Sequence, residues 1–257
     1  MKIIGTWVLF LGVIAVNALA NILPINGYNT GQISAFYPNA FVPAGFTFSI
    51  WGVIYLLLFS YTIGYTYFTF KRRQYPKAFA LIEHINFYFL LTCLFNMSWI
   101  VAWHYLQIEL SVVIMLLFLI TLIQLFLKSS TIANALTSTQ KFILQTPFIV
   151  YLGWISVATI ANSTALLVAY KWNAFSISPI YWSAAMILIA IVLAMLMLKK
   201  FKAVPFALVV AWALWGIYHA QGPAAPILAN LTAGGIGVLI TLVLFTFFNK
   251  NIKSKMA

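Results

Sequence analysis

The sequence predicts an all-α fold, a polytopic bundle of eight transmembrane helices. Of the 257 residues, 64% are hydrophobic and only 6% are charged. The apolar residues form long runs without the period-two alternation of strands. Each run has about 18 to 28 residues, which as a helix is about 27–42 Å long and crosses a hydrocarbon core of about 30 Å. In order, the runs cover about residues 3–23, 45–70, 85–106, 110–127, 142–169, 180–198, 203–220 and 226–248.

Basic residues separate these runs and predict their orientation. Those before the first run and in every second gap after it are Lys2, Lys71, Arg72, Arg73, Lys77, Lys128, Lys141, Lys199, Lys200, Lys202, Lys250, Lys253 and Lys255. Only Lys171 lies in the other set of gaps. Because basic loops stay on the cytoplasmic side, both termini are expected there. The net charge of +12 then reflects topology and contact with anionic lipid head groups, and we expect no nucleic-acid partner.

The first run has an alternative interpretation. Lys2, the apolar stretch and Ala18-Leu19-Ala20 fit a cleaved secretory signal. However, the stretch is long for that role, and Trp7 and Asn17 interrupt it. We therefore expect a retained first helix, and a mature N-terminus at Asn21 would contradict this.

The chain has few residues for catalysis. Asp is absent, and Glu83 and Glu109 lie at the edges of runs, which argues against an ion-coupled carrier with a carboxylate at mid-depth. Cys93 is the only cysteine, so an intramolecular disulfide and covalent haem attachment are excluded. No phosphate loop, HExxH or GxSxG motif occurs. We predict no catalytic residue and no metal site, and a binding protein is favoured over an enzyme.

The nine tryptophans are unevenly distributed in depth. On the predicted topology only Trp7 lies in the cytoplasmic half. An interfacial aromatic belt explains Trp103, Trp172 and Trp182. The deeper indoles are those of Trp51, Trp99, Trp154, Trp212 and Trp215. Two interpretations stand: these rings pack between helices, or they line a pocket that opens outward.

Helical spacing joins indoles to amides on two predicted faces. The faces are Asn96, Trp99 and Trp103 at i, i+3 and i+7, and Trp154, Ala158 and Asn162 at i, i+4 and i+8. A buried Asn in a membrane needs a partner. Its commoner role is an interhelical hydrogen bond, and the alternative is a polar contact inside an aromatic pocket. Trp212, Trp215 and His219 form a third face.

Three motifs follow one another along the first 170 residues. They are Pro43-Ala44-Gly45 followed by Trp51 and Tyr55, then Asn96-Met97-Ser98-Trp99, then Tyr151-Leu152-Gly153-Trp154 followed by Ala158 and Asn162. In these motifs the chain resembles the TspO/MBR family, the tryptophan-rich sensory proteins that include the mitochondrial translocator protein. It departs from the family at Val150, where a Pro is usual. It also lacks a Trp near residues 109–111 and the spacer of the animal cholesterol pattern at Tyr170-Lys171.

The resemblance implies a five-helix core over residues 1–170, with three additional helices and a basic tail over 171–257. It also implies a pocket for porphyrin, haem or other flat hydrophobic molecules, covered by the uncharged loop 24–44. The ligand-binding residues are then expected to be Trp51, Tyr55, Asn96, Trp99, Trp103, Trp154, Ala158 and Asn162. His104 and His219 are candidate contacts to haem or to a polar group of the ligand.

The predicted function is a multi-pass binding protein or sensor for such ligands in the inner or plasma membrane, with no required cofactor. One alternative is a transporter, for which Gly234-Gly235-Ile236-Gly237 would interrupt the last helix. Close packing through Ala233 and Gly237 is the preferred explanation of that stretch. Another alternative is a tetrapyrrole-modifying enzyme that uses the histidines. The expected partners are the bilayer and the ligand. The extra helices favour a monomer, and a homodimer is the alternative.

Overall fold

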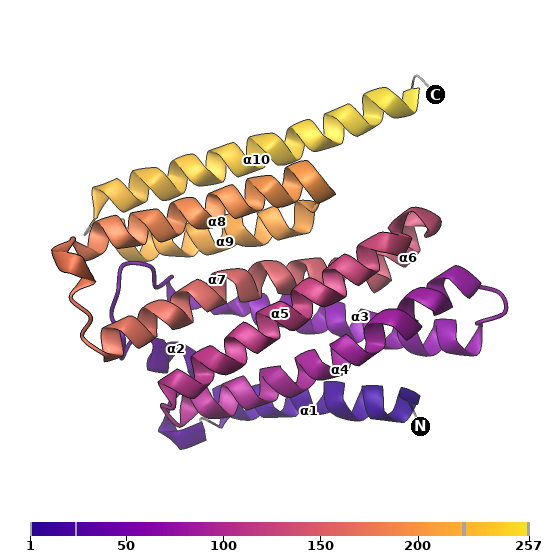
Figure 1. The fold of residues 1–257 in the computed structure, drawn as a ribbon, viewed down its shortest axis with the longest axis horizontal. Coiled ribbons are helices and arrows are strands. Elements are labelled where there is room, and N and C mark those ends of the chain that lie inside the picture. The colour runs from indigo at the N-terminus through magenta and orange to yellow at the C-terminus, as the bar shows by residue number, and fades with distance from the viewer. Residues whose placement is uncertain (1, 24, 223–224, 256–257) are drawn as a thin grey trace.

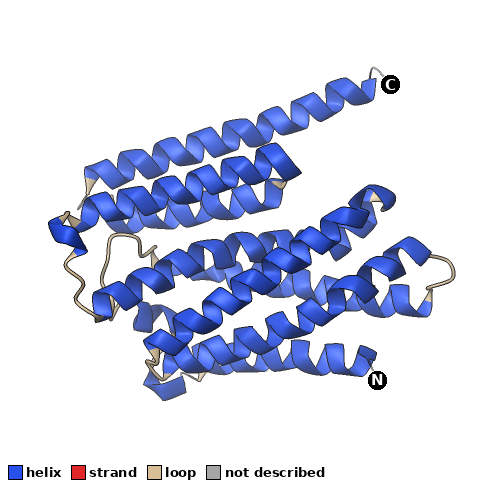
Figure 2. Ribbon diagram, in the orientation of Figure 1, coloured by secondary structure: helices blue, strands red, loops and turns tan. Residues whose placement is uncertain are grey.

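The computed structural model describes residues 2–23, 25–222 and 225–255, and in these ranges its regular structure is entirely helical (Figure 2). The long helices are α1 Lys2–Ile22, α3 Ile50–Phe70, α4 Pro76–His104, α5 Ile108–Ile132, α7 Thr146–Ala169, α8 Pro179–Phe201, α9 Val204–Gln221 and α10 Pro226–Lys255. Two short helices are α2 Thr30–Ser34 and α6 Ser138–Leu144. Among the described residues, eight helices are long and apolar enough to cross a membrane. The predicted all-α, eight-span bundle is confirmed.

Local sequence explains where several helices begin. Proline occupies the first turn of α4, α8 and α9, where its missing N–H costs no helical hydrogen bond. Helices α2 and α6 start with capping boxes, in which the side chains of Asn29 and Thr137 accept a hydrogen bond from the backbone N–H three residues later.

Some helix boundaries differ from the sequence prediction. Helix α4 begins at Pro76 instead of residue 85. Hydrophobicity marks only the part of a helix that lies in the hydrocarbon core, and the first turns of α4 extend beyond it into the interfacial region, where polar side chains are solvated. The predicted span 142–169 is divided into α6 and α7 at Gln145, whose φ and ψ are −121° and −43°. The Gln145 amide nitrogen donates to the Ser129 carbonyl oxygen of α5 at 2.7 Å, which ties the break to the neighbouring helix.

Both termini lie at one end of the bundle, together with the α3–α4 and α8–α9 connections (right side of Figure 1). We call this the basic end, because the gaps rich in Lys and Arg fall there. Lys2 and Glu83 form an exposed ion pair at this end, with Nζ and Oε1 3.4 Å apart. The opposite end, called the lid end, holds residues 25–49. The alternation of the basic gaps is thus observed, and the cytoplasmic location of the basic end stays a prediction.

The helices form two layers (Figure 1). In the first layer, α1 packs on α3 and α4, and α5 packs between α4 and α7. In the second, α10 packs against α8 and α9, and α9 joins the layers by packing on α7. Gly153 of α7 permits this approach, because a Cβ there would lie 3.1 Å from the Val209 Cβ and 3.3 Å from the Phe206 carbonyl oxygen of α9.

The glycine-rich stretch of α10 does not interrupt the helix. The interpretation of a discontinuous helix is therefore wrong. The close packing there involves Gly235, where an added Cβ would overlap Ile191 of α8. Ala233 and Gly237 are exposed, so the small-residue contact is not made by the predicted pair. Helical rotation puts Gly235 on the inner face and both of those residues on the outer face.

Candidate functional site

An aromatic cluster joins α3 to α7 beneath the lid end. Trp51 stacks on Tyr55 of the same helix, with ring centroids 5.5 Å apart. Its ring lies edge-to-face with Tyr151 at 5.9 Å and with Trp154 at 6.1 Å. Phe48 covers Trp154 from the lid side at 6.1 Å. We call these five residues the aromatic cluster. Its offset and edge-to-face geometries are those that aromatic rings prefer.

A second pair of rings lies on α4. Trp99 and Trp103 are buried and stacked, with centroids 5.7 Å apart. The Trp99 indole donates to the Asn162 Oδ1 at 2.9 Å, and the Trp103 indole donates to the Thr30 carbonyl oxygen at 3.3 Å. Trp103, which the sequence assigned to an interfacial belt, is therefore a buried contact between α4 and the lid.

The buried amides connect helices. Asn17 of α1 donates to the Asn96 Oδ1 at 2.7 Å, and Asn96 donates to the Tyr151 Oη at 2.9 Å. Asn162 donates to the Ser111 Oγ of α5 at 2.9 Å. Interhelical hydrogen bonding, the commoner of the two expected roles, accounts for both amides in this structure. Direct contact of Asn96 or Asn162 with a ligand stays a prediction.

Two buried polar atoms of the aromatic cluster are unpaired. The Tyr55 Oη and the Trp154 Nε1 have no hydrogen-bond partner within the described ranges of the chain. The Thr47 Oγ1, on the residue before Phe48, is also buried without a hydrogen-bond partner in the described ranges. An unpaired buried group costs about 1–3 kcal/mol. Because an indole N–H only donates, Trp154 needs an acceptor. The cluster is thus suited to an aromatic molecule that carries an acceptor atom.

Residues 25–49, which we call the lid, are attached to α4 through His104. The imidazole is fully buried, with Nε2 3.1 Å from the Thr30 Oγ1 and Nδ1 3.1 Å from the Ile25 carbonyl oxygen. The Asn26 amide donates to the His104 carbonyl oxygen at 3.0 Å. Both ring nitrogens are therefore engaged. In this structure His104 holds the first half of the lid and has no nitrogen free for haem.

Helix α9 attaches the second half of the lid. The Ala44 N–H donates to the Gly216 carbonyl oxygen at 3.0 Å, and the Trp212 indole donates to the Thr47 carbonyl oxygen at 2.9 Å. The Gln221 amide donates to the carbonyl oxygens of two further lid residues at 3.4 Å. Residue 216 must be glycine, because a Cβ there would overlap the Thr47 side chain. An additional helix thus helps to hold the segment that covers the aromatic cluster.

The third predicted face is only partly directed inward. Trp212 reaches the lid, whereas Trp215 is 45% exposed and His219 is exposed beside it, with ring centroids 4.6 Å apart. His219 and His104 lie on different helices, with His104 buried against Thr30 and Ile25 and His219 exposed on α9. Across the residues that the structure describes, no group of three His, Cys, Asp or Glu side chains is arranged for a metal.

A cavity of 390 Å³ lies at the lid end, between the lid, α7 and α8. We call it the lateral cavity. Residues that line it include Phe41, Thr159, Ser163, Thr164, Trp182 and Met186. No motif in the sequence marks this face of α7. The sequence feature that could have indicated a polar-lined cavity on this face is the set of hydroxyl residues at 159, 163 and 164. Two of them, Thr159 and Thr164, donate to backbone carbonyl oxygens of their own helix. Trp172 and Trp182, both predicted as belt residues, also line the cavity.

Glu109 does not contact His104. Its Oε1 accepts a hydrogen bond of 2.7 Å from the Tyr170 Oη, which joins the start of α5 to the end of α7. This hydrogen bond and the carboxylate charge raise the pKa of the Tyr170 phenol. Burial raises the pKa of Tyr37 in the lid, and the charge of Glu109 raises it further. The carboxylate at this end therefore has a structural partner.

Taken together, the spans, the covered aromatic cluster and the tethered lid define an integral, multi-pass helical membrane protein. The chain belongs to the family of TSPO-like proteins, whose sequence pattern matches residues 2–245. The resemblance to the TspO/MBR family is thereby confirmed. No curated protein and no solved structure shows significant similarity to it. The match includes α8, α9 and most of α10, and the division into residues 1–170 and 171–257 stays a prediction.

Replacing His104 with Ala is expected to release the first half of the lid. The change removes the ring contacts to Thr30 and Ile25, and each lost buried hydrogen bond costs about 1–3 kcal/mol. Hydrogen exchange of residues 25–34 should become faster by more than tenfold. His84→Ala is the matched control, because His84 is exposed on the same helix. Equal exchange in both variants would contradict the tethering role.

Proposed function

We propose that this protein is a membrane receptor for flat hydrophobic ligands of the porphyrin type, bound at the aromatic cluster beneath the lid. Membership of the TSPO-like family supports a membrane protein that binds hydrophobic ligands. The observation that carries the finer proposal is the pair of unpaired buried atoms, the Tyr55 Oη and the Trp154 Nε1, within walls of aromatic rings.

The chemistry of the cluster fits such a ligand. Stacked or edge-to-face ring contacts contribute about 0.5–1.5 kcal/mol each beyond area burial. A hydrogen bond to a charged acceptor, such as a propionate oxygen, contributes about 1.5–3 kcal/mol. Phe48 covers Trp154, so entry from the lid end requires this part of the lid to leave α9. In the proposal, the bound ligand separates the rings of α3 from those of α7.

Porphyrin titration into the purified protein tests the site. Trp154→Phe and Tyr55→Phe keep an aromatic ring and remove the polar atom. Each is expected to weaken binding about 5–10-fold, measured by the change in the Soret band, which corresponds to about 1–1.4 kcal/mol. Trp215→Phe is the matched control, since this exposed ring lies outside the aromatic cluster. Wild-type affinity in both test variants would contradict the site.

The lateral cavity is a second candidate location, because its 390 Å³ lies within the range of about 300–1,000 Å³ usual for ligand pockets. Met186→Trp would narrow it by placing a larger side chain in its lining. If this change abolishes porphyrin binding and Trp154→Phe does not, the ligand occupies the lateral cavity.

Two further measurements separate the alternative functions. Protein-dependent flux into proteoliposomes would indicate a transporter, and protein-dependent loss of porphyrin absorbance in light would indicate an enzyme.

A further inference from the structure

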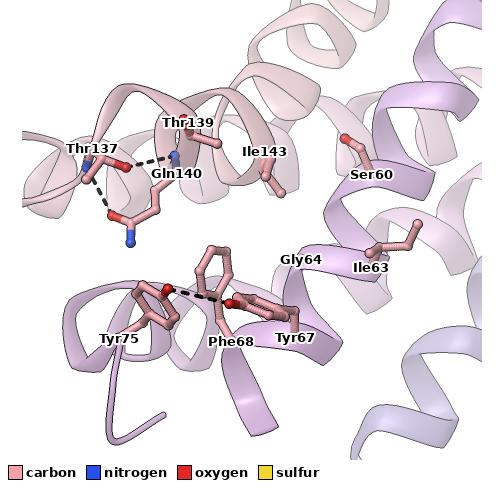
Figure 3. Close-up of a pocket in the computed structure, with 10 residues that line it drawn as sticks. All are labelled: Ser60, Ile63, Gly64, Tyr67, Phe68, Tyr75, Thr137, Thr139, Gln140 and Ile143. Atoms are coloured by element: carbon pink, nitrogen blue, oxygen red, sulfur yellow. Dashed lines mark hydrogen bonds between the residues drawn. The ribbon is translucent and has the colours of Figure 1, made fainter. Parts of the chain in front are cut away.

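A second cavity, of 490 Å³, lies at the basic end between α3 and α6 (Figure 3). The two helices touch at Gly64, where an added Cβ would overlap Ile143. Tyr67 and Phe68 of α3 form one wall of the cavity, and the facing wall includes Thr137 at the start of α6 (Figure 3). The cavity therefore begins among apolar side chains and continues toward the basic end.

The lining is amphipathic along this direction. Ile63 and Ile143 supply an apolar wall at the inner end, where the Ser60 hydroxyl donates to the Leu57 carbonyl oxygen of its own helix. Nearer the basic end are the hydroxyls of Tyr67 and Tyr75, which are 3.4 Å apart, and the capping box of α6. None of the lining residues is acidic. Such a gradient suits a molecule with an apolar tail and a polar head group.

Cations flank the cavity on both walls. Lys71, Arg72 and Arg73 follow the last turn of α3 directly after the aromatic wall and are exposed, and Lys141 adjoins the wall formed by α6. Glu83 is the only side-chain carboxylate in the sequence near this end, and its partner is Lys2. In the described ranges, no carboxylate of the chain therefore neutralises these four cations. Their combined charge favours an anionic head group.

We propose that this cavity binds one anionic phospholipid from the leaflet at the basic end. An acyl chain lies between α3 and α6, in contact with Phe68 and Ile143. The phosphate lies at the mouth, near the loop 71–73 and Lys141. The site is separate from the aromatic cluster, because the two lie at opposite ends of the bundle, and it does not depend on the function proposed above.

Native mass spectrometry of the full chain, exchanged into micelles with equal phosphatidylglycerol and phosphatidylcholine, tests the head-group contact. The wild type is expected to retain one phosphatidylglycerol in preference to phosphatidylcholine. Arg72→Gln with Arg73→Gln should lower this preference about tenfold or more, because basic residues near the surface attract anionic lipid. Lys199→Gln with Lys200→Gln removes the same charge at the same end and should leave the preference unchanged. An equal loss in both double variants would overturn the proposal.

Filling the cavity tests the acyl-chain contact. Ser60→Phe adds a ring inside the cavity and should abolish retention of both lipids. Leu56→Phe is the control on the same helix, where the side chain is 69% exposed and lies outside the lining. If Ser60→Phe does not fold, Thr139→Trp at the exposed rim closes the same space and should give the same result. Wild-type retention in a folded, filled variant would mean that the bound lipid is only annular, and would overturn the proposal.

Discussion

Gly216→Leu is expected to separate the second half of the lid from α9. A Cβ at this position would lie 2.9 Å from the Cβ atoms of both Pro43 and Thr47, which are close to the backbone and cannot rotate away. Inserting carbon atoms into such a contact costs about 1–3 kcal/mol. For a chain of this size the melting temperature should fall by about 2–10 °C. Thermal unfolding in detergent measures this change.

The same substitution should also expose the lid. The Ala44–Gly216 and Trp212–Thr47 hydrogen bonds depend on the close approach, so hydrogen exchange of residues 42–49 should accelerate. Gly234→Leu is the matched control, because a Cβ there meets no atom within 4 Å. If Gly216→Leu has the melting temperature and exchange rates of this control, α9 does not hold the lid.

Asn96→Ala is expected to destabilise the interior of the first layer by about 1–3 kcal/mol. Asn96 is fully buried, and the change removes its hydrogen bonds to Asn17 and Tyr151 together. Reversible unfolding in mixed micelles measures the difference in free energy.

A double-mutant cycle with Tyr151→Phe isolates one of these hydrogen bonds. Interhelical hydrogen bonds in membranes average about 0.6 kcal/mol, so the coupling energy between Asn96 and Tyr151 should lie near that value and below about 2 kcal/mol. Asn39→Ala is a useful reference, because that amide makes hydrogen bonds only within the lid. Zero coupling between Asn96 and Tyr151 would mean that the polar connection between α4 and α7 does not stabilise the bundle.

The lid connects the two layers of the molecule. His104 of α4 holds its first half, and Trp212, Gly216 and Gln221 of α9 hold its second half. If the ligand enters at the lid end, movement of α9 relative to α4 will control access to the aromatic cluster. Helix α9 is thus part of the structure that holds the lid in place.

The motifs predicted which residues share a helix face, but they did not predict which residues of other helices these side chains contact. Spacing correctly put Trp99 and Trp103 on one face, where they stack. It also put Trp154 and Asn162 on one face of α7, yet Trp154 contacts Trp51 and Asn162 contacts Trp99. Helical periodicity reports the direction of a side chain on its own helix. It carries no information on which neighbouring helix lies there, because that depends on how all the helices pack.

The sequence by itself determined the eight membrane-spanning helices, the alternation of the basic gaps between them and the concentration of tryptophans toward one end. These features follow from local quantities: the hydrophobicity of each run, its length, and the charges in the gaps. Only the tertiary structure decided that His104 holds the lid, that Gly235 is the contact residue of α10, and that cavities lie beside α7 and between α3 and α6. These depend on contacts between residues far apart in the chain, where the shape of two surfaces, and not the polarity of either segment, sets the geometry.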